Sequence, residues 1–207
     1  MMPASEALDR LRAGNRRFAS ADDQRTESAE ARRQGLVAGQ SPVAVILGCS
    51  DSRVPPEIIF DQGLGDLFVV RAAGNVAAPS QVGSVEFAVS RLGTRLVVVL
   101  GHSGCGAVLA ALEEQEVPSP PDAANLNSIL RRIQPSADGC VGEGSGTSLE
   151  DVVRCAVREN VKTSIRELCS SSILKELLEE GGLRVVGAEY SLETGVVDFL
   201  DDTLGTG

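Results

Sequence analysis

The chain has no tryptophan, one tyrosine and a single histidine among its 207 residues. A lone histidine, His102, excludes a site built from several imidazoles and a proton relay that needs a second one. Long apolar runs are also missing. The uninterrupted ones, at 43–47 and 96–100, have the length of a strand and fall far below the roughly 20 residues that cross a membrane as a helix. We therefore expect no membrane partner.

Basic residues are fewer than acidic ones, with 19 Lys and Arg against 29 Asp and Glu, which gives a net charge of −10. This balance argues against nucleic acid as the main partner. Residues 1–18 mix acidic and basic side chains and contain no apolar segment typical of a secretory signal. Five cysteines at irregular spacing indicate metal-binding or free thiols in a reducing compartment. We expect a cytoplasmic protein.

Strand-like and helix-like segments alternate along the chain, which predicts a single α/β domain over 1–207 with a mainly parallel central sheet. We expect a four-stranded core plus a short edge strand, flanked by helices. An N-terminal helical arm is expected at 5–39 and the α/β core at 40–200. The expected strands are 43–47, 67–71, 96–100, 183–188 and, at the edge, 196–200. The expected helices are 7–19, a short one ending near Gly39, 79–92, 107–114, 123–133 and 148–171.

The longest expected helix, 148–171, carries apolar residues at helical spacing, and Ser148 with Asp151 forms a capping box at its start. The Gly- and Ser-containing stretch 135–147 before it is predicted to be a surface loop. Three cysteines fall in this part of the chain. We expect Cys140 to be a free thiol in the loop, and Cys155 and Cys169 to be core residues of the helix.

Two short motifs supply soft metal ligands. Cys49 follows the strand at 43–47, and His102 with Cys105 follows the strand at 96–100. Because the carboxyl ends of parallel strands form the functional edge of such a sheet, these side chains converge if the two strands are neighbours. Two thiolates and one imidazole suit zinc, and three protein ligands leave a fourth position open, as in catalytic sites. An isolated cysteine or histidine is more commonly a core residue; the combination favours a metal.

Asp51 and Arg53 lie two and four residues after Cys49. A guanidinium beside the carboxylate would keep it ionised, and such a carboxylate can orient a zinc-bound hydroxide. Taken alone, the pair is more commonly a solvated ion pair of little energetic value. Its position next to a metal-ligand cysteine favours the catalytic interpretation.

Three segments, 49–53, 71–75 and 101–106, together resemble the signature of β-class carbonic anhydrases, and the resemblance extends over about residues 5 to 200. It implies one Zn²⁺ per chain, held by Cys49, His102 and Cys105. The implied reaction is the reversible hydration of CO2 to bicarbonate and a proton by zinc-bound hydroxide, with Asp51 and Arg53 as the catalytic pair. It also implies a homodimer or a dimer-based oligomer.

Further positions are similar to the plant-like subgroup of that family. Gln40 and Phe68 match its pocket residues, whereas Phe87 stands where the subgroup carries a tyrosine. Ile46 replaces a tryptophan that another subgroup uses to bind regulatory bicarbonate, so we expect an open site without that switch. Backbone N–H groups around Gly104 and Gly106 could help to bind the product anion. The resemblance thus assigns the substrate pocket to Gln40, Phe68, Phe87, Gly104 and Gly106.

Two other functions remain open at the level of the sequence. The same zinc site could hydrolyse carbonyl sulfide or carbon disulfide, which are linear molecules like CO2. The cysteines and the histidine could instead form a zinc- or redox-sensing module, which would fill all four coordination positions and gives no reason for Asp51 beside Arg53. Neither the physiological direction of the reaction nor coordination of the metal by Asp51 at low pH follows from the sequence.

Overall fold

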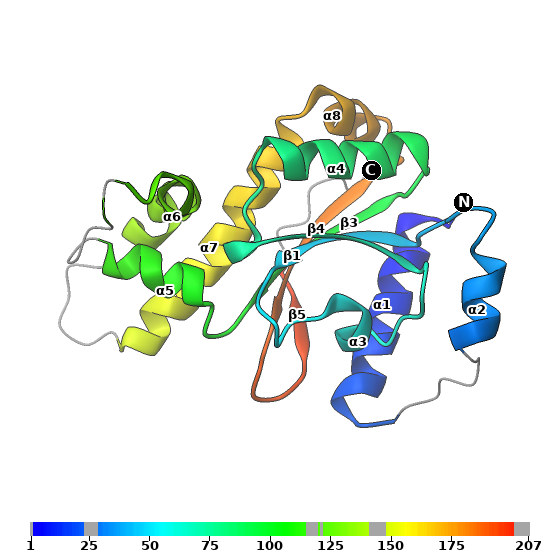
Figure 1. The fold of residues 1–207 in the computed structure, drawn as a ribbon, viewed down its shortest axis with the longest axis horizontal. Coiled ribbons are helices and arrows are strands. Elements are labelled where there is room, and N and C mark those ends of the chain that lie inside the picture. The colour runs from blue at the N-terminus through cyan, green and yellow to red at the C-terminus, as the bar shows by residue number, and fades with distance from the viewer. Residues whose placement is uncertain (1, 23–28, 115–119, 121, 141–147, 201–207) are drawn as a thin grey trace.

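A computed structural model describes residues 2–22, 29–114, 120, 122–140 and 148–200. Its centre is a five-stranded sheet in the order β2-β1-β3-β4-β5 (Figure 1). The four parallel strands are β1 (Ala44–Cys49), β2 (Leu67–Ala72), β3 (Leu96–His102) and β4 (Arg184–Tyr190). The short β5 (Val197–Phe199) pairs antiparallel with β4 at the edge. The expected parallel core with one edge strand is confirmed.

The two central strands, β1 and β3, are buried along their whole length. Their uninterrupted apolar sequences are the reason, because a parallel strand covered by helices on both faces has no solvent-facing side to make polar. The sheet also places the ends of β1 and β3 side by side, since Gly48 pairs with Leu100. The residues that follow these strands are therefore neighbours in space.

Helices cover both faces of the sheet (Figure 1). On one face, α1 (Ala4–Ala19) packs its buried Ala7, Leu8 and Leu11 against side chains of β1 and β3. On the other face, a second apolar cluster joins the sheet to α4 (Pro79–Arg91), α7 (Leu149–Cys169) and α8 (Ser172–Glu179). The shorter α2 (Ala29–Gly35), α3 (Pro56–Ile59) and the 3-10 turn η1 (Ala73–Asn75) lie in the connections.

A third apolar cluster lies beyond the carboxyl ends of the strands. It contains residues of α5 (Gly106–Glu113), α6 (Ala124–Asp138) and the first half of α7, together with Cys49 and Cys105. The side chains with metal-binding chemistry are thus set into an apolar surrounding formed by three helices. Such a surrounding strengthens electrostatic interactions within it.

Two expected boundaries were wrong, and one helix was not expected. The helix predicted to end at residue 133 continues as α6 to Asp138, with Pro135 inside it, because the buried Ile133, Ser136 and Ala137 hold its last turns against neighbouring helices. The short N-terminal helix ends at Gly35 and not near Gly39; Val37 beyond it is 85% exposed, so no packing extends the helix. Helix α8 was not foreseen.

The expectation of a free Cys140 was also wrong, because Cys140 forms a disulfide with Cys155. The longer α6 is the physical reason: it brings residue 140 back against the first turns of α7, where the two Cα atoms lie 5.8 Å apart, within the usual disulfide range. Cys155 is exposed and links α7 to the end of α6, so its expected place in the core was wrong. Cys169 is a free thiol, as are Cys49 and Cys105.

No helix among the described residues has both the length and the apolar character to cross a bilayer. The capping box predicted at the start of the long helix is confirmed. The Ser148 hydroxyl accepts a hydrogen bond from the Asp151 backbone N–H at 3.1 Å and donates to the Asp151 carboxylate at 2.7 Å.

Candidate metal centre

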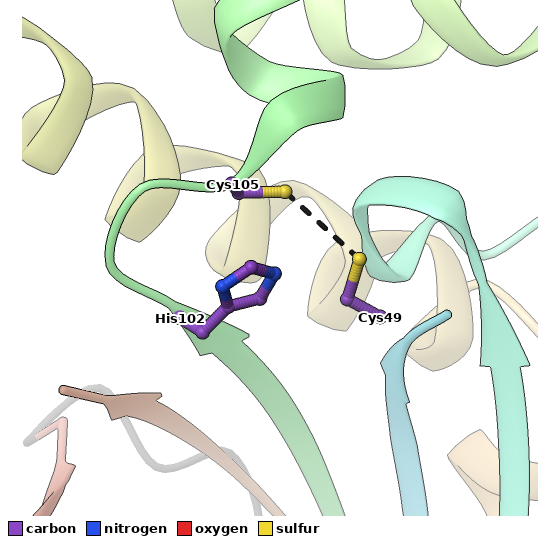
Figure 2. Close-up of side chains that lie close together, drawn as sticks. All are labelled: Cys49, His102 and Cys105. Atoms are coloured by element: carbon purple, nitrogen blue, oxygen red, sulfur yellow. Dashed lines mark hydrogen bonds between the residues drawn. The ribbon is translucent and has the colours of Figure 1, made fainter. Parts of the chain in front are cut away.

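The three predicted ligands come together at the carboxyl edge of the sheet (Figure 2). Cys49 is the last residue of β1, His102 is the last residue of β3, and Cys105 directly precedes α5. Their ligand atoms all lie within 4.8 Å of one another, and all three residues are buried. The pairing of β1 with β3 places Cys49 next to His102 and Cys105, although more than fifty residues of sequence separate Cys49 from them.

The spacing of the ligand atoms fits a tetrahedral metal ion. The sulfur atoms of Cys49 and Cys105 are 4.0 Å apart, too far for a disulfide. Two zinc–sulfur bonds of about 2.3 Å at the tetrahedral angle would place the sulfurs about 3.8 Å apart. His102 Nδ1 lies 3.0 Å from the carbonyl oxygen of Ser103 and so donates to it, and the buried Nε2 has no hydrogen-bond partner among the described residues. That tautomer presents the lone pair of Nε2 as a ligand.

The thiols of Cys49 and Cys105 affect each other strongly. The hydrogen bond with Cys105 holds the pKa of Cys49 well below its usual range, and His102 and the N–H groups of Asp51 and Gly74 act in the same direction against the effect of burial. The same hydrogen bond, together with burial, raises the pKa of Cys105. Cys49 therefore loses its proton more readily than Cys105. A bound dication would hold both sulfurs as thiolates.

The side chain of Arg53 forms two hydrogen bonds with the carboxylate of Asp51. Arg53 Nη2 donates to Asp51 Oδ2 at 2.7 Å, and Nε donates to Oδ1 at 3.0 Å. The backbone N–H of Arg53 donates to the same Oδ1. These bonds keep the pKa of Asp51 well below its usual range. Asp51 Oδ2 lies 3.9 Å from His102 Nε2, so the ionised carboxylate faces the ligand group without bonding to it.

Arg71 fixes the backbone that carries Cys49 and Asp51. Its Nε donates to the carbonyl oxygen of Cys49 at 2.8 Å, and its Nη2 donates to that of Asp51 at 2.6 Å. The sequence motif at 71–75 contains this arginine, but its spacing gives no indication of this function. The structure shows that β2 contributes to the site by holding the loop that follows β1.

The five residues assigned to the substrate pocket separate into two groups. Gly104 forms the turn between His102 and Cys105 with a positive φ of 61°, and its carbonyl oxygen lies 3.4 Å from Nη2 of Arg53. Gly106 begins α5. Both glycines are therefore next to the ligands, and their contribution to anion binding stays a prediction.

Gln40, Phe68 and Phe87 are not brought to the metal centre of the same chain. Phe68 pairs with Val45, four residues before the end of β1, so it lies about 13 Å along the strand from Cys49. Phe87 contacts Phe68, with ring centroids 6.2 Å apart, and is 50% exposed. Gln40 is exposed and precedes β1. The pocket function of these three residues stays a prediction.

Two buried polar residues of α7 were missed by the sequence analysis. Asn160 donates to the carbonyl oxygen of Gly74 at 2.7 Å, and Ser164 donates to that of Asn75 at 3.0 Å. A signal was present in the sequence, because these residues are four apart on the helix face that also carries Val161 and Ile165. Polar side chains within a buried stripe indicate a hydrogen-bonded partner.

Comparison with known proteins agrees with this arrangement. Residues 44–197 match the family model described as carbonic anhydrase. The chain is 41% identical over 189 residues to carbonic anhydrase 2 of Mycobacterium tuberculosis, covering 89% of this chain and 87% of that protein. It is 40% identical to a carbonic anhydrase of Mycolicibacterium smegmatis, covering 91% and 89%.

Solved structures show the same fold. The β-carbonic anhydrase CcaA is similar with a TM-score of 0.75 and 28% identity, over 93% of this chain and 91% of that one. One of two tetrameric β-carbonic anhydrases from Sordaria macrospora is similar with a TM-score of 0.76 and 26% identity, over 92% and 95%. A parallel α/β sheet with a Cys-His-Cys group at its carboxyl edge defines a metal-dependent class of enzyme. The chain belongs to the carbonic anhydrase family, and within it to the β class.

Proposed function

We propose that this chain is a zinc-dependent carbonic anhydrase that converts CO2 and water reversibly to bicarbonate and a proton. The observation that carries the proposal is the buried convergence of Cys49, His102 and Cys105 beside an ionised Asp51. Membership of the carbonic anhydrase family supports the same reaction.

We propose zinc as the metal because two sulfur ligands and one nitrogen ligand at tetrahedral spacing suit it, with one ion per chain. When bound, the ion supplies the Lewis acidity that makes a water molecule nucleophilic near neutral pH. The surrounding apolar cluster of α5, α6 and α7 holds the ligand group in place and limits access of bulk water to it.

Asp51 performs the orienting step in this proposal. Its carboxylate, held ionised by Arg53, accepts a hydrogen bond from the reacting water and so directs an oxygen lone pair toward the carbon of CO2. Arg53 keeps the carboxylate in position through its two side-chain bonds. His102 serves as a ligand, and the sequence contains no second histidine to carry the proton away. Proton export then depends on water and buffer.

The alternatives are less well supported. The relatives named above are carbonic anhydrases, which does not favour carbonyl sulfide or carbon disulfide as the substrate. A sensing module needs a filled fourth position, yet the potential metal group among the described residues consists of Cys49, His102 and Cys105 alone. Cys140 and Cys155 are bonded to each other and supply no ligand.

We propose a homodimer or dimer-based oligomer, in which Gln40, Phe68 and Phe87 line the pocket of a second copy. Phe68 and Phe87 form a partly exposed aromatic pair at the end of β2 remote from the metal centre of their own chain. A structural relative from Sordaria macrospora is described as tetrameric, which supports assembly.

We propose a cytoplasmic location, and the free thiols of Cys49, Cys105 and Cys169 support it. The Cys140–Cys155 disulfide argues in the opposite direction, because such bonds are uncommon in reducing compartments. Cell fractionation combined with trapping of free thiols tests the proposal; protein found only outside the cytoplasm would refute it.

The decisive experiment pairs metal analysis with a stopped-flow CO2 hydration assay on the wild type, Asp51→Ala and a control, Asp198→Ala. Asp198 is also a carboxylate paired with an arginine, at 2.9 Å from Arg158 Nη2, but it lies on the edge strand β5. We expect one zinc per chain in all three proteins and loss of activity in Asp51→Ala only. Full activity in Asp51→Ala, or a wild type that binds zinc without hydrating CO2, would refute the proposal.

A further inference from the structure

The metal-ligand thiol of Cys49 receives hydrogen bonds from two backbone N–H groups. Gly74 donates at an N–S distance of 3.3 Å, from the turn η1 that follows β2, and Asp51 donates at 3.4 Å from the loop after β1. Hydrogen bonds to a ligand sulfur reduce the charge that it gives to the metal. The orientation of the peptide group between Ala73 and Gly74, which carries this N–H, is therefore part of the metal centre, although Gly74 itself is no ligand.

We propose that Asn160 of α7 is a positioning residue for this metal centre, with Ser164 as a second anchor. Asn160 donates to the carbonyl oxygen of Gly74, which belongs to the peptide group after the Gly74 Cα, and thereby fixes the backbone dihedral angles of Gly74 so that its N–H points at Cys49 Sγ. The inference rests on the proposed metal site at Cys49, His102 and Cys105, and it adds residues that neither the motifs nor the ligand geometry identify.

The turn that carries this N–H has a backbone conformation that needs support. Gly74 has a φ of 64° and Asn75 a φ of 46°, so two successive residues occupy the left-handed region. A non-glycine residue adopts that region at a cost, and two in succession are held only when surrounding contacts fix them. The contacts that fix this turn are those of α5, α6 and α7.

Two side chains of helix α7 hold the turn by donating hydrogen bonds to the carbonyl groups of the turn. Asn160 donates to Gly74 at 2.7 Å, and Ser164, one helical turn later, donates to Asn75 at 3.0 Å. Both side chains are almost fully buried, with 1% and 3% of their surface exposed. Burying an amide and a hydroxyl is unfavourable unless they are hydrogen-bonded, and the turn provides the acceptors.

The opposite side of the turn is closed by side chains. A Cβ atom placed on Gly74 would lie 2.5 Å from Ile133 Cδ1 of α6 and 3.2 Å from the Cβ of Ala107 of α5. Gly74 is therefore held by apolar contacts with α5 and α6 and by one hydrogen bond from α7, and a second hydrogen bond from α7 holds Asn75. Removing the Asn160 amide leaves the Gly74 carbonyl without that donor and allows the dihedral angles of Gly74 to change, which misdirects its N–H.

A nearby bond of the same kind provides a matched control. The Ser136 hydroxyl of α6 is hydrogen-bonded to the Thr163 hydroxyl of α7 at 2.8 Å, and Ser136 is 4% exposed. This bond joins the same two helices as the Cys140–Cys155 disulfide, and its partners are hydrogen-bonded to each other and to residues of α7, not to Gly74 or Asn75. Ser136→Ala therefore reports the effect of losing a buried polar contact between α6 and α7 without disturbing Gly74.

The test uses the full-length protein and the variants Asn160→Asp, Ser164→Ala and Ser136→Ala. Asn160→Asp keeps the size of the side chain and replaces the donating amide by an accepting carboxylate, and Ser164→Ala removes the second anchor with little change in volume. Zinc affinity is measured by competition with a chelator. The protein loaded with Co²⁺ gives a thiolate-to-metal charge-transfer band that reports the charge on the sulfur ligands.

We expect Asn160→Asp to weaken zinc binding roughly tenfold, at the lower end of the effect of residues around metal ligands, because Cys49 Sγ is then held less firmly in the position that the metal needs. The charge-transfer band should move to longer wavelength, because a sulfur that loses an N–H donor gives its electrons up more readily. Ser164→Ala should show the same changes to a smaller extent, and Ser136→Ala should show neither.

Unchanged zinc affinity and band position in both Asn160→Asp and Ser164→Ala would overturn the inference, as would equal changes in Ser136→Ala. If Asn160→Asp does not fold, Ser164→Ala decides by the same two measurements. Because neither readout involves CO2, the outcomes separate the two proposals. A wild type that binds zinc but is inactive refutes the proposed function alone, whereas unaltered metal binding in the α7 variants refutes the positioning role alone.

Discussion

Asp51 and Arg53 form a two-point ion pair, with Oδ2 2.7 Å from Nη2 and Oδ1 3.0 Å from Nε. The two residues are only two positions apart in the sequence, and the backbone N–H of Arg53 also donates to Oδ1. This local arrangement fixes the rotation of the carboxylate, not only its charge. A planar guanidinium is needed for it, since an ammonium group offers no parallel pair of donors.

Replacing Arg53 by lysine should therefore lower CO2 hydration although the positive charge is kept. We expect a decrease of roughly 10- to 100-fold, as for other residues that orient the groups of a metal site. Stopped-flow assays measure the effect, and zinc content should remain one per chain. Arg158→Lys, at the pair that Arg158 of α7 forms with Glu189 of β4, is the control. Wild-type activity in Arg53→Lys would show that the second bond is unimportant.

Removal of the metal should destabilise the protein and expose a reactive thiol. The two sulfur atoms are 4.0 Å apart, and the hydrogen bond between them lowers the pKa of Cys49. Zinc at one hundred times its Kd should add about 2.7 kcal/mol to the free energy of unfolding. Thermal unfolding with and without chelator, and thiol alkylation with mass mapping, measure both effects. Cys169→Ser should behave as the wild type; a Tm independent of zinc would contradict the prediction.

Breaking the Cys140–Cys155 disulfide should lower the free energy of unfolding by about 3 kcal/mol, the value for a cross-link that closes a loop of some 15 residues. Urea unfolding of Cys140→Ser and Cys155→Ser measures the loss. A thiol reductant should reproduce it in the wild type and leave the variants unchanged. Cys169→Ser, at a free thiol, controls for substitution of cysteine. Equal stability of wild type and variants would show that the bond does not form.

The start of α7 should become less stable in acid. The hydrogen bond from Ser148 lowers the pKa of Asp151, so this carboxylate contributes stability that is present above its unfolded pKa of about 3.9. That contribution is lost as the pH falls through the lower pKa of the folded state. Ser148→Ala should decrease the Tm by roughly 2 to 4 °C at pH 7. The decrease should shrink at pH 2.5.

Thermal scans at the two pH values measure this difference. Ser170→Ala, at the other end of α7, is the control, because Ser170 donates to the carbonyl of Glu167 and pairs with no carboxylate. A Tm difference for Ser148→Ala that is the same at both pH values would exclude a contribution from Asp151.

Much of the fold followed from local patterns. The unbroken apolar runs at β1 and β3 predicted strands buried on both faces, and the short final segment predicted an edge strand. The boundaries around α6 and α8 were not predictable in this way, because Pro135 is a poor helix residue and only packing of Ile133 and Ala137 keeps it in a helix. The disulfide depended on that unexpected helix length.

The sequence by itself determined which atoms can bind a metal: two thiols, the only imidazole, and a carboxylate with its arginine close by. Spacing along the chain was sufficient for His102 with Cys105 and for Asp51 with Arg53, since the partners are only a few residues apart. Only the tertiary structure decided that β1 lies next to β3 and brings Cys49 to that pair. It also decided that Arg71, Asn160 and Ser164 hold the backbone around Cys49, because their hydrogen bonds join segments far apart in the chain. Contacts between distant segments produce no periodic pattern in the sequence, and therefore they can be identified only when the packing of the strands and helices is known.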